Sequence, residues 1–133
     1  MIVDSSALLA ILRREPEHSA FEKILDEADV LRISAATYFE FSIVIDSRSD
    51  PAMSREIDDL LDRFNIGIEP FTAEQAKIAR QAYRDYGKGS GHPANLNFGD
   101  CFTYALAREK REPILYKGDD FLHTDLRSAT NVR

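Results

Sequence analysis

Three carboxylates lie in mostly apolar stretches of this sequence, and they are the residues best suited to do chemistry. Glu40 stands inside the run 38–45, whose other members are mainly aromatic and branched aliphatic residues. An unpaired buried carboxylate is strongly destabilising, so a buried Glu40 needs a compensating partner. A structural ion pair or hydrogen bonds from helix N-termini would compensate Glu40 as well as a functional role would, and both explanations stay open at this point.

The other two carboxylates, Asp4 and Asp100, stand where helices are expected to begin. Asp100 falls in the first turn of an apolar helix, where the helix dipole alone favours an acid. Asp4 directly follows the apolar residues 1–3 and is also explained as a helix cap. In a parallel sheet, however, strand ends and the helices that follow them meet at one edge. Asp4, Glu40 and Asp100 are therefore expected to converge on one site.

Carboxylates gathered in this way repel one another and raise one another's pKa unless cations lie among them. Oxygen-only ligation by a few carboxylates is what Mg²⁺ and Mn²⁺ prefer, with water and substrate phosphate in the remaining positions. Such a site suits phosphodiester hydrolysis by a metal-activated water, with no protein nucleophile.

The hydrophobic periodicity predicts alternating strands and helices. Strands are expected at 1–3, 30–34, 66–70 and 114–116. Helices are expected at 7–12, after an N-cap at Ser5 or Ser6, and at 16–28, 35–47, 51–64, 73–86 and 98–110. The helix at 35–47 is apolar around most of its circumference, which predicts that it is buried. The alternation is typical of the α/β class, with a mostly parallel sheet between layers of helices.

The composition fits one domain spanning 1–133, and it raises one objection to a nucleic-acid substrate. The 17 Lys and Arg against 23 Asp and Glu give a net charge of -6, which argues against a broad basic surface for RNA. Bound divalent cations would weaken that objection. One cysteine, no basic N-terminal region before an apolar stretch and no long apolar run together predict a soluble, cytoplasmic protein with no membrane segment.

Four segments in order resemble the VapC-type PIN-domain toxins. They are Met1-Ile2-Val3-Asp4-Ser5-Ser6-Ala7, the Glu near residue 40, Leu96-Asn97-Phe98-Gly99-Asp100-Cys101, and the segment 117–125 that begins Lys117-Gly118-Asp119-Asp120. The resemblance covers essentially the whole chain. It implies a three-layer α/β/α fold and the toxin of a type II toxin–antitoxin module. It further implies an Mg²⁺- or Mn²⁺-dependent endoribonuclease, a homodimer, and a cognate VapB antitoxin, with which a hetero-oligomer is possible.

The same resemblance assigns roles to individual residues. Asp4, Glu40 and Asp100 match the acidic positions of the family, with Asp4 and Asp100 the surer metal ligands. The fourth acid is either Asp119 or Asp120, and Asp120 fits the family pattern better because it directly precedes Phe. Ser6 resembles a hydroxyl residue that supports a metal-ligating carboxylate, and a plain helix cap explains it equally well.

The basic residues and the aromatic residues are less informative. Lys88 and His92 in the glycine-rich segment 87–93, with Arg13, Arg14 and Lys117, are candidates for contacts to RNA phosphates, although such residues are more often solvated surface. The glycine-rich loop itself is expected to be functional. The aromatic residues at helical spacing, Tyr38, Phe39, Phe41, Phe98, Phe102 and Tyr104, are expected in the core or in dimer contacts.

Three alternative functions have weaker support. A phosphatase that uses the early Asp as nucleophile needs a second acid two residues later, where this chain has Ser6. A receiver domain needs a phosphoacceptor Asp after a central strand, where Phe71 follows 66–70. A catalytically silent module that acts only by binding an antitoxin fits less well, because acids stand at all four positions.

Overall fold

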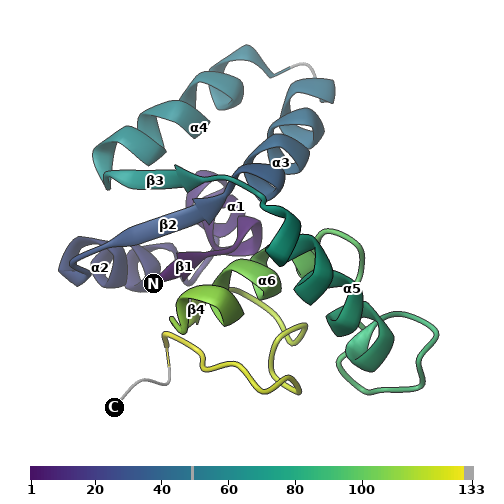
Figure 1. Ribbon diagram of the computed structural model, residues 1–133. Coiled ribbons are helices and arrows are strands. Elements are labelled where there is room, and N and C mark those ends of the chain that lie inside the picture. Colours follow the sequence, from purple (N-terminus) through teal and green to yellow (C-terminus); the bar gives the residue numbers. More distant parts are fainter. Residues whose placement is uncertain (49, 131–133) are drawn as a thin grey trace.

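A parallel sheet forms the centre of the computed structural model, which describes residues 1–48 and 50–130 (Figure 1). Its strands are β1 (Ile2–Val3), β2 (Leu31–Ser34), β3 (Ile66–Glu69) and β4 (Ile114–Leu115). The strand order is β3-β2-β1-β4, and the neighbouring strands pair in parallel. Ile2 pairs with Arg32 on one side and with Ile114 on the other. β1 is therefore an inner strand, and its carboxyl end lies between those of β2 and β4.

Helices connect the strands and cover both faces of the sheet. They are α1 (Ser5–Leu12), α2 (His18–Glu27), α3 (Ala35–Ser47), α4 (Pro51–Arg63), α5 (Ala73–Tyr86) and α6 (Asp100–Lys110). In Figure 1, α1 lies behind the sheet and α6 in front of it. Within residues 1–48 and 50–130, no helix is long and apolar enough to cross a membrane.

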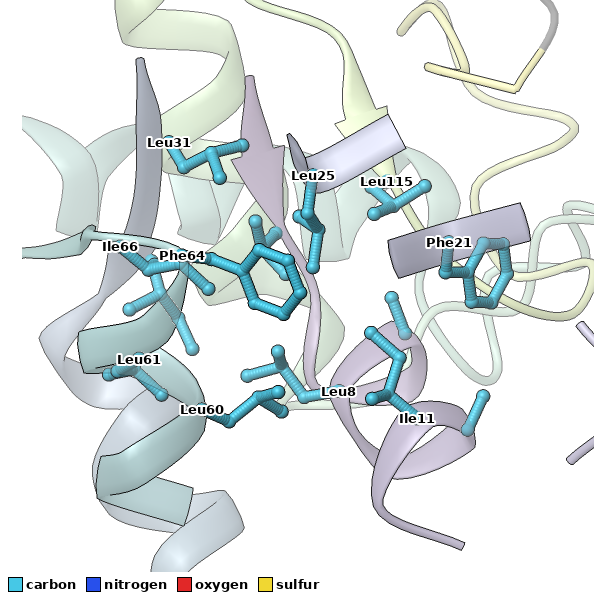
Figure 2. Close-up of a cluster of buried hydrophobic side chains, with 14 of the residues drawn as sticks. Leu8, Ile11, Phe21, Leu25, Leu31, Leu60, Leu61, Phe64, Ile66 and Leu115 are labelled. Atoms are coloured by element: carbon cyan, nitrogen blue, oxygen red, sulfur yellow. The ribbon is translucent and has the colours of Figure 1, made fainter. Parts of the chain in front are cut away.

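One face of the sheet packs against α1, α2 and α4. Figure 2 shows the side chains of this core, in which strand residues such as Leu31 and Leu115 meet helix residues. The helix residues come from four elements, since Phe41 and Ile45 of α3 join this core. The helix residues labelled in the figure are Leu8, Ile11, Phe21, Leu25, Leu60 and Leu61. Each fully buried side chain of this size stabilises the fold by roughly 1.5 to 3 kcal/mol. This core fixes α1, and with it the first turn after β1.

The opposite face packs against α5 and α6. Successive strand residues point to opposite faces, so Ile2 and Ile114 contribute to this second core while Val3 and Leu115 contribute to the first. Leu106 of α6 is completely buried in it. The two cores together confirm the predicted α/β class, with a parallel sheet between two helical layers.

The helix α3 differs from its prediction in one respect. Its residues Phe41 and Ile45 are buried, but Phe39, Ile43 and Val44 are exposed on its outer side. The prediction of a buried helix over 35–47 is therefore wrong on that side. Hydrophobic periodicity does not separate a helix inside the core from a helix whose outer face is free to meet a partner.

Two helix starts also differ from their predictions. The N-cap of α1 is Asp4, as its explanation as a helix cap requires, and Ser5 and Ser6, which were expected as N-caps, form the first turn. The last predicted helix has its regular part from Asp100, after a turn over residues 98–99. Both differences place a carboxylate, and not a neutral residue, at the helix start, where the dipole favours it.

A matched pair of leucine substitutions tests the second core. Leu106→Ala removes a fully buried side chain and leaves a cavity, so we expect a loss of about 2 to 5 kcal/mol in the free energy of unfolding. Leu122, which is 54% exposed, serves as the control, and Leu122→Ala is expected to change stability by less than about 0.5 kcal/mol. Urea unfolding followed by circular dichroism measures both. Equal losses would contradict this core.

Candidate active site

Asp4 lies at the junction where β1 ends and α1 begins. Its backbone N–H donates to Leu115 O at 3.0 Å, which ties it to the neighbouring strand β4. Its carboxylate caps α1 by accepting from Ser6 N at 3.1 Å. The Ser6 hydroxyl donates to the same oxygen, Oδ2, at 2.7 Å. Asp4 is only 5% exposed, so these donors replace water around a buried carboxylate.

A second support for Asp4 comes from α6. Thr103 Oγ1 donates to Asp4 Oδ1 at 2.6 Å, and Thr37 Oγ1 of α3 lies 3.3 Å from Thr103 Oγ1. Both threonines are almost fully buried. Three helices therefore meet around one carboxylate at the end of the central strand.

Asp100 is held at the start of α6 by a reciprocal pair of hydrogen bonds. Asn97 N donates to Asp100 Oδ2 at 3.0 Å, and Asp100 N donates to Asn97 Oδ1 at 2.8 Å. This is the geometry of a capping box. Burial raises the pKa of Asp100 to about 7, with smaller contributions from the negative charges of Asp120, Asp4 and Glu40, while the Asn97 N–H opposes the rise. A carboxylate is thus fixed among other carboxylates in a place that disfavours its charge.

Glu40 of α3 belongs to the same group of acids, but it is exposed, whereas the sequence predicted that it is buried. Its neighbours Phe39, Ile43 and Val44 are exposed as well. The expectation that burial forces Glu40 to find a partner is therefore wrong. Partial desolvation raises the pKa of its carboxyl group first, and the charge of Asp4 raises it further.

The carboxylate of Glu40 lies directly against the backbone of Gly99. A Cβ atom at residue 99 would stand 2.3 Å from Glu40 Oε1, so the Glu40 carboxylate would have to move from its place. Gly99 has ordinary helical backbone angles, so its role here is close approach and not an unusual conformation. The absence of a side chain at residue 99 lets Glu40 stand next to Asp100.

The fourth acid comes from the loop after β4. Lys117 N donates to Ser6 Oγ at 3.0 Å, so the same hydroxyl that supports Asp4 also fixes the start of this loop. Burial raises the pKa of Asp120, and the charge of Asp4 raises it further. Asp120 also acts on Asp100, whereas Asp119 contributes only through its neighbour Asp120. The charge of Asp120 therefore interacts with Asp4 and Asp100, whereas the charge of Asp119 interacts only with Asp120.

Four carboxylates therefore share the carboxyl edge of the sheet: Asp4, Glu40, Asp100 and Asp120. Burial first, and repulsion from the other carboxylates second, raise the pKa of Glu40, Asp100 and Asp120. Hard oxygen donors in this arrangement match the ligand preference of Mg²⁺ and Mn²⁺. In the described ranges, no three acidic, His or Cys side chains stand close enough to form a ready-made metal cage. The donor set fits a hard divalent cation, and its binding would require these side chains to draw together.

The basic residues that were candidates for RNA contacts lie in different surroundings. The Lys117 side chain forms ion pairs with Glu15 and with Glu17, the latter at 2.7 Å, so its charge is already compensated. Arg13 and Arg14 follow α1 and are exposed, as is Lys88. Contact of these residues with RNA stays a prediction.

The glycine-rich segment 87–93 has a structural anchor. His92 packs edge-on against Tyr86 with ring centroids 4.8 Å apart, and Lys88 N donates to Leu96 O at 2.8 Å. These contacts fix the segment to the end of α5. A functional role for it stays a prediction.

The six aromatic residues divide into three groups by their burial, and Tyr38 and Phe102 are half-buried. Phe41 and Tyr104 are buried, in agreement with the expectation of a core role. Phe39 and Phe98 are 67% and 71% exposed, so for these two a core role is wrong. Phe98 precedes Gly99, and Phe39 precedes Glu40, which places two large apolar side chains at the border of the acidic site.

Three residues that hold the acids in place were missed in the sequence. Asn97 carried a signal, because a capping residue three positions before an acid is the spacing of a capping box. Thr103 also carried one, because residues three apart on a helix share a face and Asp100 was already a candidate. Gly99 carried none, since its need arises only from a contact with a side chain 59 positions away in the sequence.

Comparisons with known proteins identify the family of this chain. A family model described as PIN domain matches residues 1–126. Ribonuclease VapC28 of Mycobacterium tuberculosis is 53% identical over 133 residues, which is 100% of both chains. Ribonuclease VapC42 of the same species is 48% identical over 129 residues, or 97% of this chain and 98% of that one. The crystal structure of VapC20 of M. tuberculosis, named a sarcin–ricin loop cleaving toxin, superposes with a TM-score of 0.72. The match covers 94% of this chain and 95% of the VapC20 chain at 16% sequence identity, and it shows that the two chains share a fold.

The raised pKa of Asp100 predicts how the stability of the metal-free chain depends on pH. In the unfolded chain the carboxyl group titrates near 3.8, and in the folded chain near 7. The folded state therefore holds the proton more tightly, and its stability falls as pH rises from about 4 through 7.

Asp100→Asn removes this titration and keeps an oxygen that can accept from Asn97 N. We expect the metal-free variant to be more stable than the natural chain at pH 8 by up to about 4 kcal/mol, with the difference shrinking toward pH 4. Urea unfolding in the presence of a chelator measures it. A difference that does not change with pH would show that Asp100 carries no such strain.

Proposed function

Because this chain belongs to the PIN-domain family and, within it, to the VapC ribonucleases, we propose that it cleaves RNA at the acidic site with bound divalent metal. The observation that carries the proposal is the convergence of Asp4, Glu40, Asp100 and Asp120 on the carboxyl end of the central strand. Neither the phosphatase nor the receiver alternative fits the family. In this proposal the chain is the toxin of a type II toxin–antitoxin module.

The residues that would hold the metal are Asp4, Asp100 and Asp120, with Glu40 beside them. When bound, Mg²⁺ or Mn²⁺ supplies a water of lowered pKa and neutralises charge on the phosphate and the leaving oxygen. The chain does the positioning. Asp4 is fixed by the hydrogen bonds from Ser6 and Thr103, and Asp100 is fixed by Asn97. Glu40 is exposed, unlike Asp4 and Asp100, and it adds a carboxylate at the open side of the site.

The partners that this proposal includes are RNA, a VapB-type antitoxin and a second copy of the chain. The exposed Phe39 and Ile43 of α3 and the exposed Phe98 support a protein partner at the border of the site, because large apolar side chains are unfavourable in water. The net charge of -6 supports a need for metal, because phosphate must approach four carboxylates.

The neighbouring pair Asp119 and Asp120 offers a matched test of the site. Asp120→Asn removes a carboxylate that is coupled to Asp4 and Asp100, so we expect RNA cleavage to fall by at least about 100-fold. Asp119→Asn makes the same chemical change one residue away and is expected to leave cleavage nearly unchanged. The measurement is cleavage of total RNA by the purified chain with Mg²⁺ or Mn²⁺.

Metal removal completes this test. A chelator should stop cleavage by the natural chain, and added Mn²⁺ should restore it. Cleavage that survives chelation would contradict the metal requirement, and equal loss in both variants would contradict the placement of the fourth acid.

Gly99→Ala separates activity from stability. The new methyl group would displace the Glu40 carboxylate, so we expect RNA cleavage to fall by about 10-fold or more. Stability should change by less than about 1 kcal/mol, because Gly99 already has helical backbone angles that Ala adopts and Glu40 is a flexible side chain that can move away.

Gly67→Ala is the matched control. A Cβ at residue 67 would meet only Leu31 O, at an ordinary 3.7 Å, so cleavage should be unchanged. The role assigned to Gly99 is wrong if Gly99→Ala cleaves RNA as fast as the natural chain does.

A further inference from the structure

Thr103 lies on the buried side of Asp4 and contacts its carboxylate at the proposed metal site. We propose that Thr103 is a positioning residue, which holds the Asp4 carboxylate so that one position on Oδ1 is left to bind a cation. The inference rests on the proposed function, because it assigns a task at the same site. It concerns a residue that touches neither substrate nor metal and acts through Asp4.

The placement of Thr103 carries the first step. Its side chain is completely buried, and its hydroxyl lies 2.6 Å from Asp4 Oδ1. It follows Asp100 by three residues, so both side chains lie on the same side of α6. One helix therefore supplies an acid of the site and, one turn later, the hydrogen bond that holds a second acid.

The direction of the hydrogen bonds follows from the chemistry of the groups. An ionised carboxylate only accepts, so the Thr103 hydroxyl must donate its one proton to Asp4. In the contact of 3.3 Å between Thr37 and Thr103, Thr37 must then be the donor. The two hydroxyls form a chain that points at Asp4, and such chains strengthen each member.

The acceptor capacity of Asp4 carries the last step. Each carboxylate oxygen accepts about two hydrogen bonds or metal contacts. Oδ2 already accepts from Ser6 N and from Ser6 Oγ, whereas Oδ1 accepts from Thr103 alone among residues 1–48 and 50–130. One position on Oδ1 therefore remains, and Thr103 sets its direction. Without the Thr103 hydroxyl the carboxylate would be free to turn on that side.

The test measures metal binding without RNA. Mn²⁺ titrations of the natural 133-residue chain and of its variants Thr103→Val and Thr103→Ser, followed by electron paramagnetic resonance, give the affinity of each. Thr103→Val has nearly the same shape but no hydroxyl, and we expect its Mn²⁺ affinity to fall by about 10- to 100-fold. Thr103→Ser keeps the hydroxyl and is expected to retain most of the affinity. Thermal unfolding with a chelator reports the stability of each chain.

The outcomes separate this inference from the proposed function. If the natural chain binds no Mn²⁺, the metal site and the role of Thr103 both fail. If the natural chain binds Mn²⁺ and Thr103→Val binds it equally well, the metal site stands and Thr103 is only structural. A loss of thermal stability with unchanged Mn²⁺ affinity would likewise make Thr103 only structural. Should Thr103→Val fail to fold, Thr103→Ala removes the same hydroxyl with a smaller side chain and is measured in its place.

Discussion

Repulsion among carboxylates at one edge of the sheet is the constraint on which the rest of this structure depends. Asp4 and Asp100 are buried there, and Glu40 and Asp120 add charge from α3 and from the loop after β4. Like charges in a poorly solvated place destabilise the fold unless donors or cations compensate them. The chain supplies the donors through Ser6, Thr103 and Asn97, and in the proposed function a bound cation supplies the remaining compensation.

The fold brings these donors together because of its strand order. β1 is only two residues long and lies between β2 and β4, so its end is surrounded by the segments that follow its neighbours. The connection after β1 becomes α1, the segment after β2 becomes α3, and the loop after β4 carries Asp120. α6 reaches the same edge with its N-terminus, where the helix dipole favours Asp100. Ser6 joins two of these segments, since it bonds both Asp4 and Lys117 N.

Changes in hydrophobic period predicted the α/β class and placed Asp4 and Asp100 at a strand end and a helix start, whereas the choice between Asp119 and Asp120 came from the family resemblance. For Glu40 the expectation of burial was wrong, since an apolar run around a helix marks either a core or a free face. The role of Gly99 could not be predicted, because it depends on a contact with Glu40 from a distant segment of the chain. Lys117 was taken as a candidate for RNA contact, and only the fold reveals Glu15 and Glu17 beside it. Features set by local spacing were predictable, and features set by contacts between segments were not.

Localisation of Mn²⁺ by anomalous diffraction from crystals of the natural chain tests the proposed metal site most directly. We expect anomalous density in direct contact with Asp4 Oδ1 and with a carboxylate oxygen of Asp100 or Asp120. Ser6 and Thr103 should keep their hydrogen bonds to Asp4 in the same crystals. Anomalous density at other residues, with these carboxylates unligated in crystals that hold Mn²⁺, would contradict a metal site at this edge of the sheet.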